Sequence, residues 1–552
     1  MGNALVLPGR GQGGRGLAAA VLAASTALAQ ACGSGAGDAG RGGAGAADGS
    51  SATPARGGTA KVGVIAEPKT FLDWAAETTV DSYAADLVFR RLARRSSVSG
   101  SFVPDLAESW QTLPDGRTIA FQLRRGVLWE DGIGLTASDV RFTEDRARMP
   151  EASISGYKEA IESVEATGSH QVVFHFRRPD PEMLAHAVLG HVYPEHLLGS
   201  VDARDLQTLP FHRRPVGSGP FRLAEWEPAR YLSFVARRDG TPGERPHLDR
   251  VVMRIFADKT SALRELEGGG LDLLFKVPRE TADRLASRGD LTIHRVPTHG
   301  YVFVVWNTKR APWSRVEVRQ ALAASIDRKA LASRFEGTET ALASGPVPAD
   351  HPWHDPAPSS TSYEPAATAA RLTSVGWRIS GDGRWLDEQG AKVRLEILVQ
   401  HGNTVLQDTA AVVADNLRRV GLEAEVRQMD LTTLRARVEE KGDFDAALYS
   451  RPSTAPVDLA GCFGSGGAEN YAKLADPDLE TMLDAFGRET DLEKARETFV
   501  RAARRVGELE PWTFLYYRSE TIAASRRLRG LEGCLPNVME CASEWWIPKD
   551  RQ

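Results

Sequence analysis

The stretch from Leu106 to Thr143, LAESWQTLPDGRTIAFQLRRGVLWEDGIGLTASDVRFT, carries the strongest structural signal in the chain. Within it Ile119, Phe121 and Leu123 share one side of a period-two pattern, with polar or small residues between them. Successive side chains of a strand point to opposite faces, so this alternation predicts a half-buried β-strand.

Turn residues on the far side of this strand predict a β-hairpin. Arg124 to Gly126 would form the turn, Val127 and Trp129 would restore the inward face, and an Asp-Gly pair at 131–132 would close the far end. Glu130 and Asp131 are adjacent carboxylates that could suggest an acid–base pair. Consecutive strand residues point apart, however, so the two carboxylates would not easily converge on one substrate atom, and the hairpin is favoured.

Composition indicates a folded, multidomain protein. A chain of 552 residues with 42% hydrophobic residues predicts two to four domains with several cores. The formal net charge of -5, from 68 basic and 73 acidic residues, argues against a nucleic-acid-binding surface.

The N-terminus has the pattern of an export signal. Arg10 and Arg15 precede an apolar run, residues 17–31, that is short for a membrane span, so residues 1–31 are predicted to be a signal peptide. Cys32 follows at once, and two processing modes remain open: lipidation of Cys32 after an imperfect lipobox, or cleavage at the A-x-A sequence of residues 29–31. The Gly/Ala/Ser-rich segment 32–57 is predicted to be a flexible tether, which favours lipidation and a membrane anchor.

Three further cysteines follow, Cys462, Cys534 and Cys541. Export permits a disulfide between Cys534 and Cys541, although their closeness in the sequence does not establish one.

Helical and strand patterns alternate along the rest of the chain, which predicts α/β architecture. The segment 314–331 has capping-box spacing at Ser314 and Glu317 and predicts one amphipathic helix. Residues 302–308, VFVVWNT, predict a buried central strand. A helix that stops at Gly421 and two more near residues 479–486 and 492–506 are also expected.

Catalytic motifs are scarce. The chain contains no G-x-S-x-G, H-E-x-x-H or P-loop sequence, so it is not expected to be an enzyme or to use a cofactor. Ser155 and Lys158 form an S-x-x-K match without its usual companion motifs. His351 and His354 lie in a Pro-rich loop and are more simply loop residues than metal ligands, so no metal site is predicted.

The order of several longer stretches resembles the family 5 extracellular solute-binding proteins, the dipeptide- and oligopeptide-binding subunits of bacterial ABC importers. The resemblance covers about residues 58 to 548. It rests on the stretch quoted first and then, in order, on RRPVGSGPFRLAEWEPARYLSF, LRELEGGGLDLLF, WNTKRAPWSRVEVRQALAASIDRKAL, ARLTSVGWRISGDGRWLDEQG, DNLRRVGLEAEV and PWTFLYYRSE.

This resemblance implies a two-lobed, periplasmic-binding-protein-like α/β fold with a ligand cleft between the lobes. Lobe one is expected at 58–297 plus 521–552, with an extra subdomain near 93–210, and lobe two at 298–520. Closure of the lobes around a solute would let a membrane permease recognise the loaded protein without chemistry on the solute.

The peptide-binding relatives place an amine-binding Asp three residues after a Trp. Counted without gaps from FDAALYSRPSTAPVDLAG, these two positions hold Thr454 and Arg451, so the amine-binding carboxylate is missing unless Asp458 replaces it. Arg451 offers a planar fork of donors that would favour a carboxylate or phosphate. Alternatively, Arg451 turns outward and pairs with a surface acid such as Glu440 or Asp443.

The resemblance implies four further ligand contacts, Tyr301, Trp306, Asn307 and His401. The expected function is that of a monomeric, exported cell-envelope lipoprotein that binds a peptide or peptide-like solute and serves an ABC permease and its ATPase. Non-peptide solutes of the same fold (an oligosaccharide, an opine-like anion or a nickel chelate) and an exported hydrolase are the alternatives.

Overall fold

The structure is a computed structural model of the chain. It describes residues 54–552 apart from 96–100, 153, 155–157, 180–181, 203–204, 206–208, 243–244, 338–341, 349–350, 352, 356–361, 452–456, 490 and 536. Cys32, the predicted signal peptide and the predicted tether up to residue 53 lie outside the described residues, as do Ser155 and Thr454.

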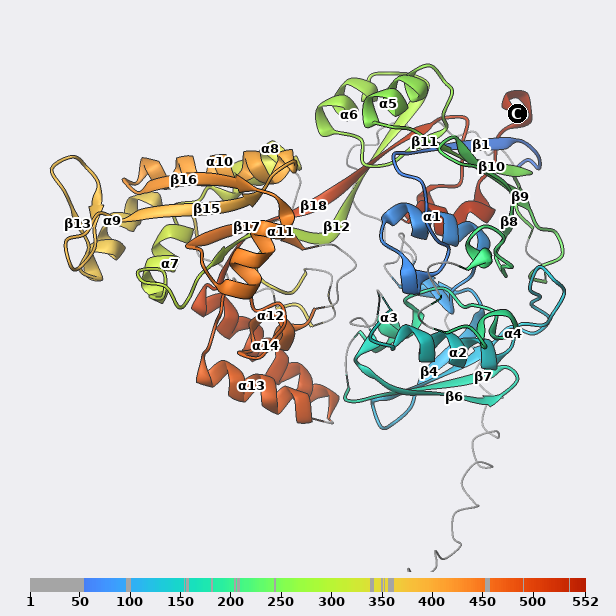
Figure 1. The fold of residues 1–552 in the computed structure, drawn as a ribbon, viewed down its shortest axis with the longest axis horizontal. Helices are drawn as coiled ribbons and strands as arrows, with labels where there is room; N and C mark the ends of the chain where they lie inside the picture. The colour runs from blue at the N-terminus through green and yellow to red at the C-terminus, as the bar shows by residue number, and fades with distance from the viewer. Residues whose placement is uncertain are drawn as a thin grey trace, which may run out of the picture. The chain divides into compact units, whose positions relative to one another are not determined.

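A ten-stranded mixed sheet is the framework of the fold (Figure 1). Its strands, in spatial order, are β16 (Glu423–Met429), β15 (Arg394–Gln400), β17 (Ala446–Arg451), β12 (Leu291–Trp306), β18 (Trp512–Ser525), β11 (Leu273–Leu274), β1 (Thr59–Val64), β10 (Arg250–Ile255), β9 (Tyr231–Ala236) and β8 (Phe221–Glu227).

The two longest strands, β12 and β18, pair antiparallel at the centre of this sheet. Their first section pairs Leu291 to Pro297 with Ser525 to Ser519, and the ladder resumes at the Tyr301–Tyr517 pair after a break in register. On its other side β18 pairs with β11, and β12 pairs on its other side with β17, both antiparallel. We propose that this break marks the border between lobe one, 58–297 plus 521–552, and lobe two, 298–520.

Smaller sheets complete the strand inventory. A four-stranded antiparallel sheet has the order β4 (Ala107–Thr112), β5 (Thr118–Leu123), β7 (Gln171–Phe176) and β6 (Ile161–Gly168), within the segment expected to form the extra subdomain. Two-stranded pairs join β2 (Ala93–Arg95) to β3 (Phe102–Pro104) and β13 (Arg378–Ile379) to β14 (Trp385–Leu386).

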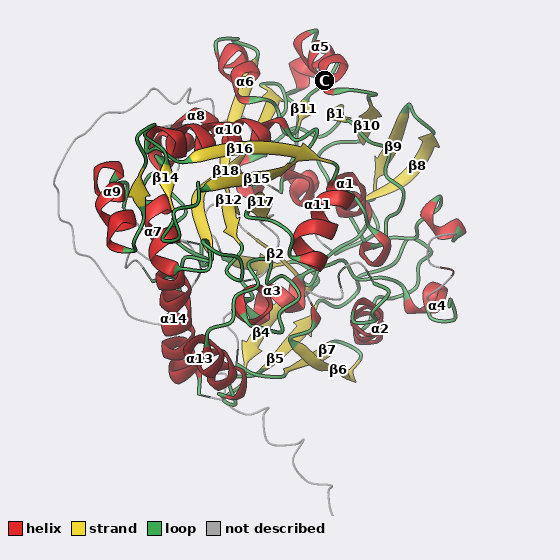
Figure 2. Cartoon of the chain, turned by 60° about the vertical axis from the view of Figure 1, so that its left-hand side comes forward, coloured by secondary structure: helices red, strands yellow, loops and turns green. Residues whose placement is uncertain are grey.

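Helices cover both faces of the sheet in residues 298–520, and each face has its own core (Figure 2). One core is closed by α7 (Val316–Ala323), α8 (Arg328–Phe335), α9 (Pro365–Ser374) and α10 (Thr404–Arg419). The other is closed by α11 (Leu431–Arg435) with the π-helical turn η5 (Ala436–Lys441), α12 (Leu459–Phe463), α13 (Pro477–Arg488) and α14 (Leu492–Leu509).

The remaining helices belong to the rest of the chain. They are η1 (Asp73–Ala75), α1 (Thr79–Val88), α2 (Ala137–Ala147), α3 (Met183–Val188), α4 (Glu195–Leu198), η4 (Pro210–His212), α5 (Lys259–Glu267), α6 (Arg279–Ala286), η6 (Glu532–Cys534), η7 (Val538–Glu544) and η8 (Lys549–Arg551). Of the described helices, none is long and apolar enough to cross a membrane.

The strand predicted in the first-quoted stretch is present, but it pairs with other strands than the predicted hairpin partner. Thr118–Leu123 is a strand with the predicted inward face, but it pairs with β4 and β7. Val127 and Trp129 are buried outside that ladder, in a separate tight turn whose bridge joins Leu128 to Gly134. The hairpin pairing was therefore wrong because the periodicity identifies a strand's inward face and not its neighbour.

The predicted helix at 314–331 is two helices, α7 and α8. Its apolar face is correct, since Val318, Leu322 and Ile326 are fully buried. The predicted capping box is wrong, because α7 begins after Arg315 and no side chain caps it. The predicted stop at Gly421 is confirmed by its positive φ of 87°, which follows α10.

A buried charge network connects segments that are far apart in the sequence, around Asp73, Asp86 and His191. His191 Nδ1 lies 3.0 Å from Asp73 Oδ2, and its Nε2 lies 2.8 Å from Asp86 Oδ1. Arg91 donates to the same Asp86 oxygen at 2.9 Å. Burial and Arg91 act to lower the pKa of His191, but the two carboxylates outweigh them and raise it. Burial acts to raise the pKa of Asp73, but His191 and Arg91 hold it well below its usual range.

We expect His191→Gln to lower the free energy of unfolding by about 3 to 5 kcal/mol, because two buried carboxylates lose their shared cation. The raised histidine pKa stabilises the fold below about pH 6.5, and the lowered aspartate pKa stabilises it above about pH 4. The loss should therefore be largest between these pH values and should fall off outside them. Urea unfolding across this range measures it.

The matched control is His401→Gln, because His401 is exposed. It should change the unfolding free energy by no more than about 0.5 kcal/mol. An equal effect of the two substitutions would mean that the His191 network is energetically neutral.

Candidate binding site

One edge of the sheet gathers several of the residues that the sequence singled out. Strands β15, β16 and β17 run parallel, so their carboxyl ends share an edge, and His401 and Arg451 lie there. Strand β12 runs antiparallel to β17 and pairs Tyr301 with Arg451, which brings Tyr301 to the same edge. Ligands of open α/β sheets bind outside the carboxyl ends of the strands, so this edge is the candidate site.

A partly buried ion pair is the main polar feature of this edge. Arg451 Nη1 pairs with Glu469 Oε2 and also donates to Cys462 Sγ at 3.2 Å. The Cys462 thiol donates to the same Glu469 oxygen at 3.4 Å. The Arg451 side chain is 12% exposed and that of Glu469 is 44% exposed, so the carboxylate is the more accessible member.

Both protein groups behind the carboxylate keep their ordinary protonation states at neutral pH. Burial acts to lower the pKa of Arg451, but Cys462, Tyr301 and Glu469 raise it above its usual value. Burial raises the pKa of the Cys462 thiol, although Arg451 opposes this shift. The site therefore holds a guanidinium and a neutral thiol behind Glu469.

The loop after α12 holds Glu469 in a defined place. The Glu469 backbone N–H donates to Gly461 O at 2.9 Å. Asn470 Nδ2 donates to Gly464 O and Leu474 O, both at 2.8 Å. A Cβ on Gly467 would lie 2.3 Å from Gly461 O, so only glycine fits this close approach. The position of Glu469 is thus set by main-chain contacts as well as by Arg451.

Aromatic rings adjoin the ion pair. The Tyr301 ring lies 5.4 Å from Phe514 and 6.4 Å from Tyr517, centroid to centroid. Tyr449 and Tyr471 stack at 5.3 Å and are half-buried. Burial raises the pKa of Tyr471, and the carboxylates of Glu469 and Glu439 raise it further, although Arg451 opposes this shift.

Two of the predicted ligand contacts lie at the opposite end of the strand. Trp306 pairs with Ala446, five residues along β12 from the Tyr301–Arg451 pair, a separation of about 17 Å at 3.3 Å per residue. Trp306 is fully buried, and its Nε1 donates to Thr513 Oγ1 at 2.9 Å. Asn307 Nδ2 donates to Gly442 O and Phe444 O, each at 2.9 Å.

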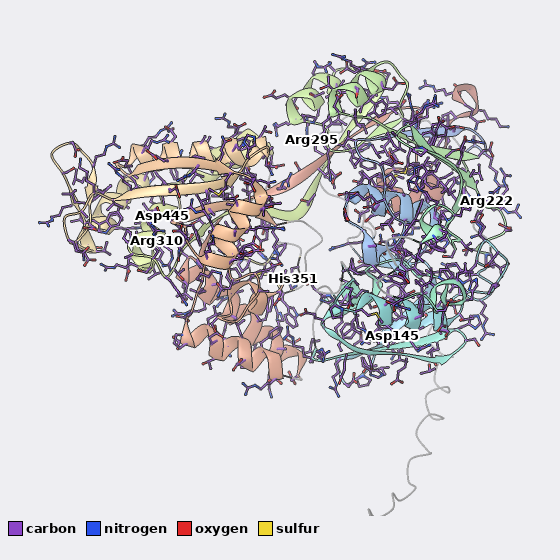
Figure 3. All side chains as sticks on the ribbon, in the orientation of Figure 1. Asp145, Arg222, Arg295, Arg310, His351 and Asp445 are labelled. Atoms are coloured by element: carbon purple, nitrogen blue, oxygen red, sulfur yellow. A yellow bond between two sulfur atoms is a disulfide. The ribbon has the colours of Figure 1, made fainter. Side chains whose placement is uncertain are left out.

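A different pair of charged residues lies at this end of the strand. Arg310 Nε lies 3.1 Å from Asp445 Oδ1, the residue just before β17, and Figure 3 labels both. Trp306 and Asn307 therefore lie at the opposite edge of the sheet from Tyr301, and their contact with a ligand stays a prediction. An odd spacing of five residues also turns the Trp306 and Tyr301 side chains to opposite faces of the sheet.

The other predicted positions have mixed outcomes. His401 is exposed at the candidate edge, with its Nδ1 3.2 Å from Gln428 Oε1. Asp458 caps α12 by accepting from Gly461 N at 2.9 Å, so its carboxylate serves the helix. Arg451 pairs with Glu469 and not with the surface acids Glu440 or Asp443 suggested as its partners.

The remaining polar candidates have structural partners. Asp131 Oδ2 lies 2.7 Å from His196 Nε2. Glu130 instead lines a separate cavity of about 510 Å³ with Arg213 and Trp226, and burial raises its pKa. The two carboxylates therefore do not converge.

Lys158, from the S-x-x-K match, is fully buried and donates to Glu144 at 2.9 Å and His186 O at 2.8 Å. His351 (labelled in Figure 3) stacks on Phe499 at 5.6 Å. Among the described residues no group of three or more acidic, His or Cys side chains could hold a metal ion. The structure joins Cys534 to Cys541 in a disulfide, as permitted but not established by the sequence.

Sequence reasoning did not identify Glu469 and named Cys462 only as one of three further cysteines. The available signal was the cluster of glycines between Gly461 and Gly467, which indicates that the chain passes close to another backbone. Such a loop can hold a carboxylate rigidly, but nothing in the sequence states that Arg451 is its partner.

Comparisons with known proteins agree with this architecture. Residues 101–467 match the model of the bacterial extracellular solute-binding proteins, family 5 Middle. The chain is 26% identical over 512 residues to the oligopeptide-binding protein AppA of Bacillus subtilis, covering 91% of this chain and 93% of that protein.

Solved structures show the same fold. AppA from Bacillus subtilis in complex with a nonapeptide superposes with a TM-score of 0.70 at 26% identity, over 90% of this chain and 100% of that one. NikZ from Campylobacter jejuni in complex with Ni(L-His) has a TM-score of 0.72 at 22% identity, over 88% and 99%. AgaA from A. tumefaciens R10 in complex with agropinic acid has 0.67 at 22%, over 89% and 99%. The predicted two-lobed α/β fold is confirmed.

The buried position of Trp306 predicts that its substitution affects stability and not ligand affinity. We expect Trp306→Phe to lower the unfolding free energy by about 1 to 3 kcal/mol, because buried Thr513 Oγ1 loses a hydrogen-bond donor. Affinity for any ligand should stay within about twofold, because the indole contacts only the core. Chemical unfolding and calorimetric titration measure the two quantities.

Tyr363→Phe is the control, since this tyrosine is 48% exposed and its removal should leave both quantities unchanged. If Trp306→Phe instead weakened ligand binding at unchanged stability, the indole would have to reach the ligand.

Proposed function

Because the chain belongs to the bacterial extracellular solute-binding proteins of family 5, we propose that it captures a peptide or peptide-like solute between its lobes and delivers it to the permease of an ABC importer. The observation that carries this proposal is the polar cluster of Arg451, Glu469 and Tyr301 at the carboxyl-end edge of β17. Such an edge offers charged and aromatic groups to a ligand without any catalytic constellation.

The pair of β12 and β18 supports a hinge mechanism. These strands connect the two proposed lobes, and their ladder is interrupted between Pro297 and Tyr301. A solute that contacts both lobes binds best when they are closed, so its binding energy shifts the hinge equilibrium towards the closed state. The permease and its ATPase would respond to that state.

Similarity to AppA favours a peptide ligand, since AppA is an oligopeptide-binding protein. NikZ and AgaA share the fold and were solved with Ni(L-His) and agropinic acid. A nickel chelate, an opine-like anion or an oligosaccharide is therefore the second ligand class that a binding test has to include.

We expect purified protein to be stabilised by a pool of peptides two to nine residues long and to return every peptide intact. A ligand present at 100 times its Kd should add about 2.7 kcal/mol to the unfolding free energy. Thermal unfolding with and without the pool, followed by mass spectrometry of the bound and free fractions, measures both. Parallel pools hold Ni(L-His), opines and oligosaccharides.

Consumption of a pool component would contradict the transport proposal and favour the exported hydrolase. If only a non-peptide pool stabilised the protein, its ligand would be a non-peptide solute and not the proposed peptide.

Membrane attachment is the second part of the proposal. We infer that the signal peptide, residues 1–31, is removed, that Cys32 is lipidated, and that residues 32–57 tether the folded part to the outer face of the cell membrane. The sequence before Cys32 and the Gly/Ala/Ser-rich segment after it support this inference.

The full-length protein should partition with membranes, and Cys32→Ser should release it or leave it uncleaved. Cell fractionation and the mass of the mature N-terminus measure the outcome. A soluble mature protein that begins at residue 32 in both forms would instead indicate cleavage after Ala31 without lipidation.

A further inference from the structure

A second cavity lies in lobe one, away from the candidate binding site. It has a volume of about 510 Å³ and is bounded by strand β8, by the segment after η4 and by the turn that holds Glu130. Strand β8 is the last strand of the ten-stranded sheet, and seven strand spacings separate it from β17, about 34 Å along the sheet at 4.8 Å per strand. Figure 3 labels Arg222 on β8 and Asp445 beside β17. The cavity is therefore distinct from the edge at Arg451.

One wall of this cavity is a stack of charged and aromatic groups. The Arg213 guanidinium lies 3.8 Å from the ring centroid of Trp226. Trp226 Nε1 donates to Glu67 Oε1 at 2.7 Å, and Glu67 Oε2 accepts from Ala229 N at 3.1 Å. Arg213 Nη1 also lies 3.8 Å from Glu67 Oε1. The charge of Arg213 is thus already balanced by Glu67 and by the indole face, and the indole is held in place.

The turn at Glu130 contributes a carboxylate without a side-chain partner. The Glu130 backbone N–H donates to Gly217 O at 3.0 Å, which positions the residue. Its carboxylate is half-buried, and no hydrogen bond or ion pair from another described residue reaches it. Burial raises the pKa of Glu130, and Arg222 and Arg237 oppose this shift only in part. A ligand that brings an ammonium group would supply the missing partner.

Arg214 supplies the complementary charge. Its side chain is exposed, and within the described ranges its guanidinium has neither an ion pair nor a hydrogen bond. A guanidinium of this kind favours a carboxylate, with which it forms two parallel hydrogen bonds. Val216 and Leu223 are half-buried and add apolar surface to the same cavity. The cavity therefore combines a free anion, a free cation and an apolar wall.

We propose that this cavity is a second ligand-binding site that takes a free aliphatic α-amino acid. Glu130 receives the ammonium group, Arg214 receives the carboxylate, and Val216 and Leu223 contact the side chain. A volume of about 510 Å³ lies within the usual range of small-molecule sites. The inference is independent of the proposed transport function, which concerns the cleft between the lobes.

Three related solutes test the inference: L-leucine, N-acetyl-L-leucine, which lacks the ammonium group, and L-leucinamide, which lacks the carboxylate. Wild type should bind L-leucine about 10- to 100-fold more tightly than either derivative, because each derivative loses a hydrogen bond between charged groups. Calorimetric titration of the full chain measures the three affinities.

Two substitutions separate the two contacts. Glu130→Gln should remove the preference for L-leucine over N-acetyl-L-leucine, and Arg214→Gln should remove the preference over L-leucinamide. Because Arg214 is exposed, its variant tests the site even if Glu130→Gln does not fold. The matched control is Glu497→Gln, which changes an exposed carboxylate on α14 and should keep both preferences.

A diazirine analogue of leucine locates the bound amino acid. After irradiation, the label should appear on peptides that contain Glu130 or residues 213–226. Label confined to residues 446–471 would place leucine at the candidate edge and overturn the second site, as would the absence of saturable L-leucine binding. A full preference over N-acetyl-L-leucine in Glu130→Gln, or over L-leucinamide in Arg214→Gln, would overturn the role given to that residue.

Discussion

The antiparallel pairing of β12 with β18 is the interaction on which the rest of the structure depends. In the ten-stranded sheet β12 and β18 are neighbours and lie between β17 on one side and β11 on the other. Strand β12 has 16 residues and β18 has 14, well above the usual five or six. Loss of this ladder would separate the sheet into two halves.

The same pairing positions the candidate site. Its register aligns Tyr301 with Tyr517 on one side, and the β12–β17 ladder aligns Tyr301 with Arg451 on the other. Three strands from distant parts of the chain thereby contribute neighbouring side chains at one edge. The helices α12 and α14 pack on that face and bring Cys462 and the Glu469 loop against Arg451.

The charged side chains of the two proposed lobes differ in how far they are exposed to solvent. Around His191 the buried carboxylates of Asp73 and Asp86 pair with cations inside the protein, so the network holds distant segments together. At the Arg451–Glu469 pair the cation is buried and the anion is half exposed. This second arrangement leaves a half-exposed carboxylate that a solute could reach.

The sequence by itself determined the α/β class, the family resemblance, the inward face of Thr118–Leu123, the burial of residues 302–306 and the helix stop at Gly421. Each of these depends on local periodicity, turn chemistry or segment order, which are properties of neighbouring residues. Tertiary structure decided which strands pair, and so it decided that β5 joins β4 and β7 and that Trp306 and Asn307 lie far from Tyr301. It also decided that Arg451 contacts Glu469, which lies 18 residues away in the sequence. That contact depends on how the segment containing α12 packs against β17, and no local sequence pattern encodes such packing.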